Sequence, residues 1–163
     1  MPDAVFPTPI GPCRLRWQDD RLTGFALPES NLIAATPVHP PPAWIAALIT
    51  RVQTHLCGNC DDFSDQPYAF EQVSNFARDV YRCTLQIKAG CTCSYGDIAR
   101  QLGLPVSASR AVGAALGANP WPLLVPCHRV LAADGRMSGF SGPGGITMKL
   151  RLIAIEGAQL FGP

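Results

Sequence analysis

Large apolar residues alternate with other residues in two short segments near the N-terminus, GPCRLRW (residues 11–17) and RLTGFAL (residues 21–27). Alternation with a period of two is typical of β-strands that bury one face. The residues QDD (18–20) between the segments suit a turn, because Asp side chains tolerate turn conformations. The two segments therefore predict an antiparallel hairpin.

The period lengthens to that of a helix after the proline-rich stretch HPPPAW (residues 39–44). Over 43–56 an apolar residue recurs every four positions, which predicts an amphipathic helix. A polar, turn-rich stretch follows over 57–67, and a second helix is expected after Ser74. The apolar stripe of the first helix consists of Trp44, Leu48, Val52 and Leu56.

These elements predict an α+β protein in two parts. A chain of 163 residues with 47% hydrophobic content is long enough to bury one good core or two small ones. Residues 1–70 would form a small antiparallel sheet domain with a helix and the connector. Residues 71–163 would form a mainly helical domain.

Two short helices of nearly equal length are predicted in the second part, over 94–103 and 106–116. SYGD at 94–97 has the Ser-x-x-Asp form of a helix start, and Gly103 is a natural C-terminal stop. Two helices joined by a Gly-containing turn form either a helix-turn-helix motif, which presents its second helix to DNA, or a plain helical hairpin in a core. The pattern alone leaves both open.

The second of these helices favours one mode of DNA binding. Its leading face carries Ser, Ala and Gly, and Arg110 is its only long side chain. Base reading in the major groove needs long polar side chains, so sequence-specific reading is not expected. Small residues let a backbone approach the minor groove, and a protruding arginine can fill the gap left by an extruded base. We expect sequence-independent binding in the minor groove.

Charge is distributed unevenly along the chain. Residues 1–75 carry four Lys and Arg against eight Asp and Glu, whereas residues 76–163 carry nine against four, for a net charge of +1. Clustered basic residues are the main source of affinity for nucleic acid. The basic rear half is therefore expected to face double-stranded DNA, although ordinary scatter of surface charge produces such a split fairly often.

The compartment follows from what the chain lacks. No apolar window approaches the length of a membrane span, and the first residues, MPDAVFPTPIGPC, lack the segments of a signal peptide. We expect a cytoplasmic, monomeric protein that does not associate with a membrane. In a reducing compartment the seven cysteines should mostly be free thiols, metal ligands or catalytic groups.

One stretch, LLVPCHRV (residues 123–130), places Cys127, His128 and Arg129 side by side between apolar residues. An apolar run of this kind predicts a buried strand, which has little use for such a trio unless it is reactive. A thiol becomes a nucleophile as thiolate, and a neighbouring base or cation lowers its pKa. On a strand Cys127 and His128 would face opposite ways, so they meet only if Pro126 bends the chain or a water bridges them. Glu156 is the candidate acid for orienting His128.

The region around Cys127 resembles a known protein family. The run NPWPLLVPCHRVLAADGRMSGFSGPGGITMKLRLIAIEG (residues 119–157) closely resembles the signature of the O6-alkylguanine-DNA alkyltransferases, also called methylated-DNA–protein-cysteine methyltransferases. The resemblance spans roughly residues 76–158, and the Pro-Cys-His-Arg core is highly specific. It implies a single-turnover enzyme without a cofactor that moves an alkyl group from O6 of guanine in duplex DNA to its own cysteine. O4-alkylthymine as a further substrate is left open.

The resemblance also implies roles for individual residues. Cys127 would accept the alkyl group, His128 would act as base through a water, Glu156 would orient His128, and Asn119 would hold the local turn. Tyr95 would help to rotate the nucleotide and protonate the departing guanine. The implied DNA-binding residues are Arg110, Tyr95, Ser109, Ala108 and Arg129. The implied substrate pocket consists of Leu116, Pro122, Val125, Val130, Phe140 and Ser141.

Two alternative functions differ from this one. A DNA-binding module could recognise alkylated bases without repairing them, although the family's lesion-binding relatives lack the cysteine that is present here as Cys127. A Cys-His-Glu hydrolase would catalyse many turnovers and would need an oxyanion hole, which no motif in the sequence indicates.

No metal is expected. The stretch HLCGNC nevertheless places His55, Cys57 and Cys60 at a spacing seen in zinc sites, with Cys13 or His39 as a fourth ligand. Some relatives bind zinc in this domain, but with a pattern that does not match these residues.

Overall fold

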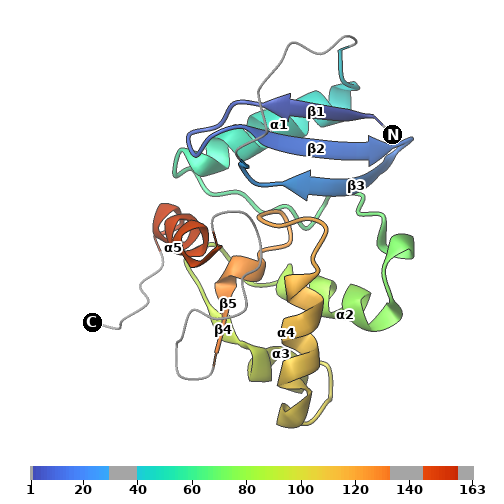
Figure 1. Cartoon of the computed structure of the whole chain (residues 1–163), viewed down its shortest axis with the longest axis vertical. Helices are drawn as coiled ribbons and strands as arrows, with labels where there is room; N and C mark the ends of the chain where they lie inside the picture. The colour runs from blue at the N-terminus through green and yellow to red at the C-terminus, as the bar shows by residue number, and fades with distance from the viewer. Residues whose placement is uncertain (1, 30–39, 133–144, 158–163) are drawn as a thin grey trace.

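A three-stranded antiparallel sheet forms at the N-terminal end of the chain (Figure 1). The computed structural model describes residues 2–29, 40–132 and 145–157. Strand β1 (Asp3–Phe6) pairs with β2 (Cys13–Gln18), which pairs with β3 (Arg21–Ala26). The predicted hairpin is thus confirmed, with Asp19 in its turn at a φ of 53°. Strand β1 was not predicted, because four residues are too few to display an alternating pattern.

Helix α1 (Ala43–Leu56) covers one face of this sheet (Figure 1). The predicted helix is therefore confirmed. Leu48, Val52 and Leu56 of its apolar stripe are buried, whereas Trp44 is only half-buried and Ile45 lies in the core. The core stripe is thus shifted by one position at the start of the helix.

The remaining helices make up most of the second half of the chain. Helix α2 (Asn75–Thr84) begins after Ser74, whose hydroxyl accepts a hydrogen bond from the N–H of Ala77 at 3.1 Å. A short 3₁₀ helix, η1 (Phe70–Gln72), precedes it, and α5 (Gly145–Ile155) is the last helix of the described residues. The α+β class predicted from the sequence is confirmed. Among the described residues no helix is both long and apolar enough to cross a membrane.

The predicted pair of helices consists of α3 (Tyr95–Gln101) and α4 (Ser109–Gly117). Ser94 and Asp97 form the expected capping box at the start of α3. Gly103 has a φ of 73° in the turn, a conformation that glycine adopts without strain. The second helix starts later than expected, because the first three of its predicted residues form a 3₁₀ turn, η2 (Val106–Ala108).

The segment LLVPCHRV is not the buried strand that its composition predicts. Leu123 adopts a φ of 78°, and the trio forms a single 3₁₀ turn, η3 (Cys127–Arg129). Only then does strand β5 (Val130–Leu131) begin, in parallel pairing with β4 (Cys93–Ser94). The trio is therefore presented on a turn directly before β5, and β4, the partner of β5, leads directly into α3.

One hydrophobic core continues from the sheet into the helical part, with Trp121 among its largest buried side chains. The Trp121 ring makes edge contacts with Tyr68, Phe70 and Tyr81, and its Nε1–H donates to the carbonyl of Leu22 at 3.0 Å. The loop before Cys127 is thus fixed against strand β3.

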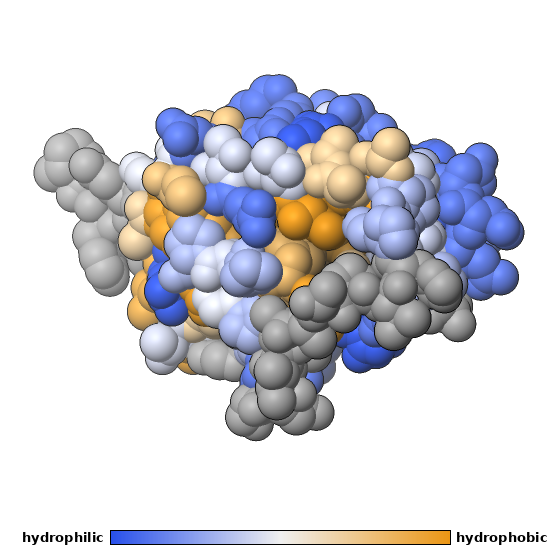
Figure 2. Space-filling model, turned by 90° about the horizontal axis from the view of Figure 1, so that it is seen from above, coloured by the Kyte–Doolittle hydropathy of each residue, from blue (hydrophilic) through white to orange (hydrophobic). Residues whose placement is uncertain are grey.

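The division of the chain into two domains at residue 70 stays a prediction. Seen from the sheet end, hydrophobic residues lie in the middle of the face and toward its left edge, and hydrophilic residues lie along the top and right (Figure 2).

Candidate active site

The carboxylate of Glu156, at the end of α5, lies at the centre of the candidate site. Its Oε1 accepts hydrogen bonds from Nε2 of His128 at 2.9 Å and from Nε of Arg129 at 2.8 Å. Its Oε2 accepts from Nη2 of Arg129 at 2.7 Å and from Nε2 of His55 at 2.9 Å. The Glu156 side chain is only 1% exposed. Each oxygen thus has two donors, the arrangement in which a buried carboxylate is fully satisfied.

These donors decide the charge of Glu156. Burial by itself raises the pKa of a carboxyl group, but the hydrogen bonds from Arg129, His128 and His55 outweigh it and hold the pKa of Glu156 far below its ordinary value of 4.5. The group is therefore ionised at neutral pH. Because an ionised carboxylate only accepts hydrogen bonds, Nε2 of His128 must carry the proton.

His128 is consequently a neutral imidazole with Nδ1 free to accept a proton. Burial lowers its pKa below the ordinary 6.5, and the hydrogen bond that His128 donates to Glu156, which raises the pKa, does not cancel this effect. Its Nδ1 atom is buried and has no hydrogen-bond partner within the described part of the chain. The Nδ1 lone pair can therefore accept a proton, and His128 can act as a base.

The Cys127 thiol is buried, and burial raises its pKa above the ordinary 9.0. A hydrogen bond from the Asn119 side chain and the positive charge of Lys149 act in the opposite direction without cancelling the effect. The resting group is therefore the protonated thiol. It needs a base at the moment of attack, since the nucleophile is the thiolate.

Asn119 spans the turn that leads to the thiol. Its Nδ2 donates to the carbonyl of Val125 at 3.0 Å, and its Oδ1 accepts from the N–H of Trp121 at 2.9 Å. The N–H of Cys127 donates to the same Val125 carbonyl at 2.7 Å. The side chain thus ties together the two ends of the loop that carries Leu123 in its left-handed conformation.

Tyr95 is the first residue of α3 and lies within electrostatic range of the Cys127 thiol. Burial raises its pKa, and negative charge at Cys127 raises it further. Strand β4 directly precedes Tyr95 and pairs with β5, which directly follows the trio. A Cβ added at Gly113 of α4 would lie 3.8 Å from the Tyr95 ring, an ordinary van der Waals distance, so the ring packs against α4 at this position.

The predicted DNA-contacting residues of the second helix gather at its start. Arg110 is exposed and forms no ion pair with any other described residue. Ser109 and Ala108 are half-buried, and the Ser109 hydroxyl donates to the carbonyl of Val106 at 2.6 Å. Val106 itself is 55% exposed, the most exposed large apolar residue of the described chain. These positions thus combine one free cation with small side chains and an exposed apolar one.

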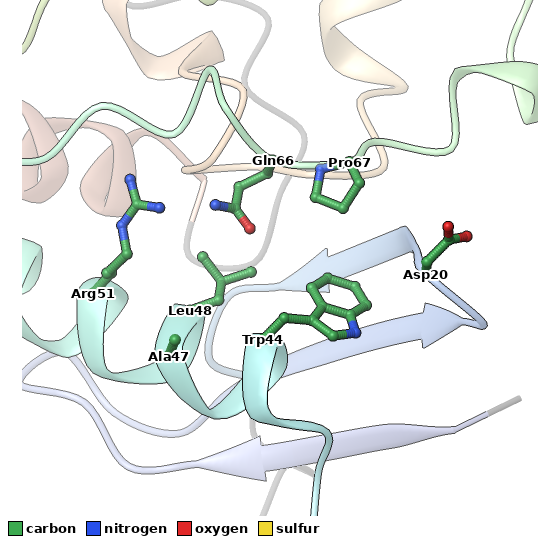
Figure 3. Close-up of a pocket in the computed structure, with 7 residues that line it drawn as sticks. All are labelled: Asp20, Trp44, Ala47, Leu48, Arg51, Gln66 and Pro67. Carbon is green, nitrogen blue, oxygen red and sulfur yellow. The ribbon is translucent and has the colours of Figure 1, made fainter.

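The predicted pocket residues fall into two groups. Leu116, Val125 and Val130 are buried, and Pro122 is half-buried beside them in sequence. Phe140 and Ser141 lie outside the described residues. The pocket drawn in Figure 3 is a different one, of about 320 Å³, between α1, the β2–β3 turn and the connector. None of the residues that line it belongs to the predicted site.

The DNA-binding role predicted for Arg129 is wrong. Its guanidinium is buried, binds both oxygens of Glu156, and donates from Nη1 to the carbonyl of Ile87 at 2.6 Å. Its donors are therefore used inside the protein, and the residue neutralises the carboxylate rather than a phosphate.

The alternative zinc site is not assembled. Both ring nitrogens of His55 are occupied, because Nδ1 accepts from the N–H of Asp61 at 2.9 Å while Nε2 faces Glu156. Cys57 and Cys60 are exposed, whereas His55 is 1% exposed. Within residues 2–29, 40–132 and 145–157, no three His, Cys, Asp or Glu side chains group closely enough to hold a metal ion. His39 lies outside these ranges.

Two residues of the site were not predicted in this role. Lys149 of α5 is 1% exposed, and its Nζ donates to the carbonyl of Val130 at 2.8 Å. A lysine inside the apolar run of residues 146–155 was the available signal for it. His55 is 101 positions from Glu156 in the sequence, and no local pattern links the two.

The chain is similar in sequence to several known proteins. The family described as 6-O-methylguanine DNA methyltransferase, DNA binding domain, matches residues 75–158. A Thermus thermophilus protein named DNA base-flipping protein is 40% identical over 154 residues, 93% of this chain and 97% of its own. A Mycobacterium bovis methylated-DNA–protein-cysteine methyltransferase is 34% identical over 91% of this chain and 88% of its own.

The fold comparison gives the same result. The crystal structure of Mycobacterium tuberculosis OGT in complex with DNA superposes with a TM-score of 0.78 at 31% identity, over 97% of this chain and 95% of that one. The structure of the O6-methylguanine-DNA methyltransferase from Pyrococcus kodakaraensis superposes with a TM-score of 0.72 at 26% identity. Sequence and fold together establish that the chain belongs to the 6-O-methylguanine DNA methyltransferase family.

Proposed function

We propose that this protein repairs alkylated duplex DNA by moving the alkyl group from O6 of guanine to the Sγ atom of Cys127. The observation that carries the proposal is the chain of buried groups from Arg129 through Glu156 to His128, which ends in an unpartnered Nδ1 next to a protonated thiol in the sequence. This arrangement provides a nucleophile, a base and a group that orients the base.

The transfer balances as a single displacement. The thiol proton passes through one water to Nδ1 of His128, and Sγ forms a bond to the alkyl carbon as the bond from that carbon to O6 breaks. Tyr95, whose raised pKa keeps it protonated, donates a proton to the departing guanine. The products are an unmodified guanine, an S-alkylcysteine, a protonated His128 and an ionised Tyr95, and the two side chains regain their resting states by proton exchange with water. Since a thioether is not hydrolysed under these conditions, each molecule acts once.

A buried thiol requires an extruded base. Because Cys127 is only 6% exposed, a guanine stacked in a duplex cannot reach it. We infer that α4 enters the minor groove, where its small residues allow close approach, and that Arg110 occupies the space left by the flipped nucleotide. The apolar residues Leu116, Val125 and Val130 would then receive the base.

A lesion-binding protein without transfer activity is the second candidate. The Thermus thermophilus relative, named for base flipping, is the observation that favours it. The two candidates share the extrusion step and differ only at the thiol. The Asn119 side chain and the charge of Lys149 both act on the Cys127 thiol, and His128, which follows it in the sequence, is oriented by Glu156. A binding module has no need of these groups. We therefore favour transfer.

The test is to incubate the protein with a duplex that carries one O6-methylguanine and to measure the intact masses of the protein and the DNA strand by mass spectrometry. The proposal predicts that the DNA strand loses about 14 Da and the protein gains the same mass, the difference between a methyl group and a hydrogen atom, with Cys127→Ser inert. Tight binding with both masses unchanged would favour the lesion-binding alternative.

A further inference from the structure

Helix α1 delivers one side chain from the N-terminal half of the chain to the centre of the candidate site. His55, in the last turn of α1, is 1% exposed, and its Nε2 lies 2.9 Å from Oε2 of Glu156. It is the only donor to this carboxylate from outside the segment 127–156 among the described residues. The orienting group of the site is thus shared between the two halves of the chain.

The connector that follows α1 fixes the tautomer of His55. The backbone N–H of Asp61 donates to Nδ1, so the ring proton must lie on Nε2 and point to Glu156. The carboxylate of Asp61 is held in turn by Arg51, with contacts of 2.8 and 3.0 Å. The Phe63 ring makes an edge contact with the imidazole at a centroid distance of 5.4 Å. The side chain is therefore held in place from both sides.

We propose that His55 is a positioning residue for alkyl transfer, which holds Oε2 of Glu156 so that Oε1 stays aligned with His128. The inference rests on the proposed function. Without His55, Oε2 keeps only its contact with Arg129, and the carboxylate loses one of the four hydrogen bonds that fix its position. His128 would then lose the orientation that keeps Nδ1 available to the thiol. Supporting groups of this kind commonly change activity about 10- to 100-fold.

The test compares two substitutions of the same residue. His55→Phe keeps a ring against Phe63 but removes both hydrogen bonds. His55→Gln keeps an amide N–H for Glu156 and an amide oxygen for Asp61. We expect the single-turnover transfer rate to fall by about tenfold or more in His55→Phe and to recover to within about threefold of wild type in His55→Gln. Equal rates in His55→Phe and wild type would overturn the inference.

A matched control separates positioning from loss of stability. Val52→Ala removes a fully buried side chain from the same helix, one turn earlier, without touching Glu156. Thermal melts identify folded preparations, and the control should lower the melting temperature while leaving the rate nearly unchanged. If Val52→Ala slows transfer as much as His55→Phe at the same loss of stability, the effect is structural and the inference fails.

A double-mutant cycle asks whether the effect passes through Glu156. In a Glu156→Gln background, His55→Phe should cause little further loss of rate, because the alignment is already broken. Independent, multiplicative losses would contradict the proposed route. A wild-type protein that takes up no methyl group would instead refute the proposed function, so the two failures are distinguishable.

Discussion

Nε2 of His128 lies 2.9 Å from Oε1 of Glu156, and this contact sets the protonation state of the whole site. The carboxylate is ionised because Arg129 and two histidines donate to it. His128 must therefore donate from Nε2, which leaves Nδ1 as the acceptor. A protonated thiol and a neutral base thus coexist at neutral pH, and the first prediction depends on this pairing.

The transfer rate should be nearly independent of pH between about 6.5 and 8.5. The lowered pKa of His128 keeps the base neutral throughout this range, and the raised pKa of Cys127 keeps the thiol protonated. Single-turnover rates measured across the range would check this. A rate that rises about tenfold per pH unit would mean that free ionisation of the thiol limits the reaction, without help from the base.

Glu156→Gln should slow transfer and weaken the fold at the same time. The substitution leaves Arg129 buried without its counter-charge, which typically destabilises a protein by about 3–5 kcal/mol. Chemical denaturation would give the loss of unfolding free energy. An unchanged free energy of unfolding would show that Arg129 finds another partner.

The same carboxylate predicts a pH dependence of stability. Because the folded-state pKa of Glu156 is below its ordinary 4.5, the unfolded chain binds the extra proton as the pH falls. Its contribution is therefore complete above about pH 4.5 and declines below that value, by up to about 1.4 kcal/mol per pH unit. Between about pH 5 and 3, wild type should lose stability more steeply than Glu156→Gln. Parallel curves would contradict the assignment.

Tyr95→Phe should lower the transfer rate by about tenfold or more while DNA affinity stays within about twofold. The substitution removes the proton that the departing guanine needs but keeps the ring that packs near Gly113. Rates and dissociation constants measured on the same duplex would separate the two effects. A loss of affinity with an unchanged rate would assign Tyr95 to binding alone.

Arg110→Ala should slow repair of duplex DNA by about tenfold or more and leave transfer from a free O6-alkylguanine base unchanged. Its side chain is needed only to fill the duplex, and a free base needs no extrusion. Arg14→Ala is the control, because Arg14 lies on strand β2 and pairs with Asp3. Equal losses on both substrates for Arg110→Ala would mean that it acts on folding or on the thiol.

Local features were predictable from the sequence. The hairpin of β2 and β3 and the capping box of Ser94 and Asp97 were read correctly, because each depends on neighbouring residues. The trio was predicted as part of a strand, since nothing in its composition reveals the left-handed Leu123 that leads into a 3₁₀ turn.

Long-range pairing was the part that the sequence did not reveal. The family resemblance implied that Arg129 contacts DNA. Its partner, Glu156, is 27 positions away in the sequence. The pair that the two residues form is buried, so the Arg129 side chain does not lie at the surface as expected. His55 was considered only as a metal ligand, because its contact with Glu156 joins two halves of the chain that share no local pattern.

The proposed alkyl transfer to Cys127 is tested most directly by a titration of the protein with an excess of duplex carrying O6-methylguanine. The measured quantity is the number of methyl groups transferred per protein molecule. We expect a plateau at one methyl per protein molecule, located on Cys127 by peptide mapping and absent in Cys127→Ser. Continued turnover would indicate a hydrolase-like enzyme. Tight binding of the duplex with no methyl group on Cys127 would show that the protein binds the lesion without transferring the alkyl group.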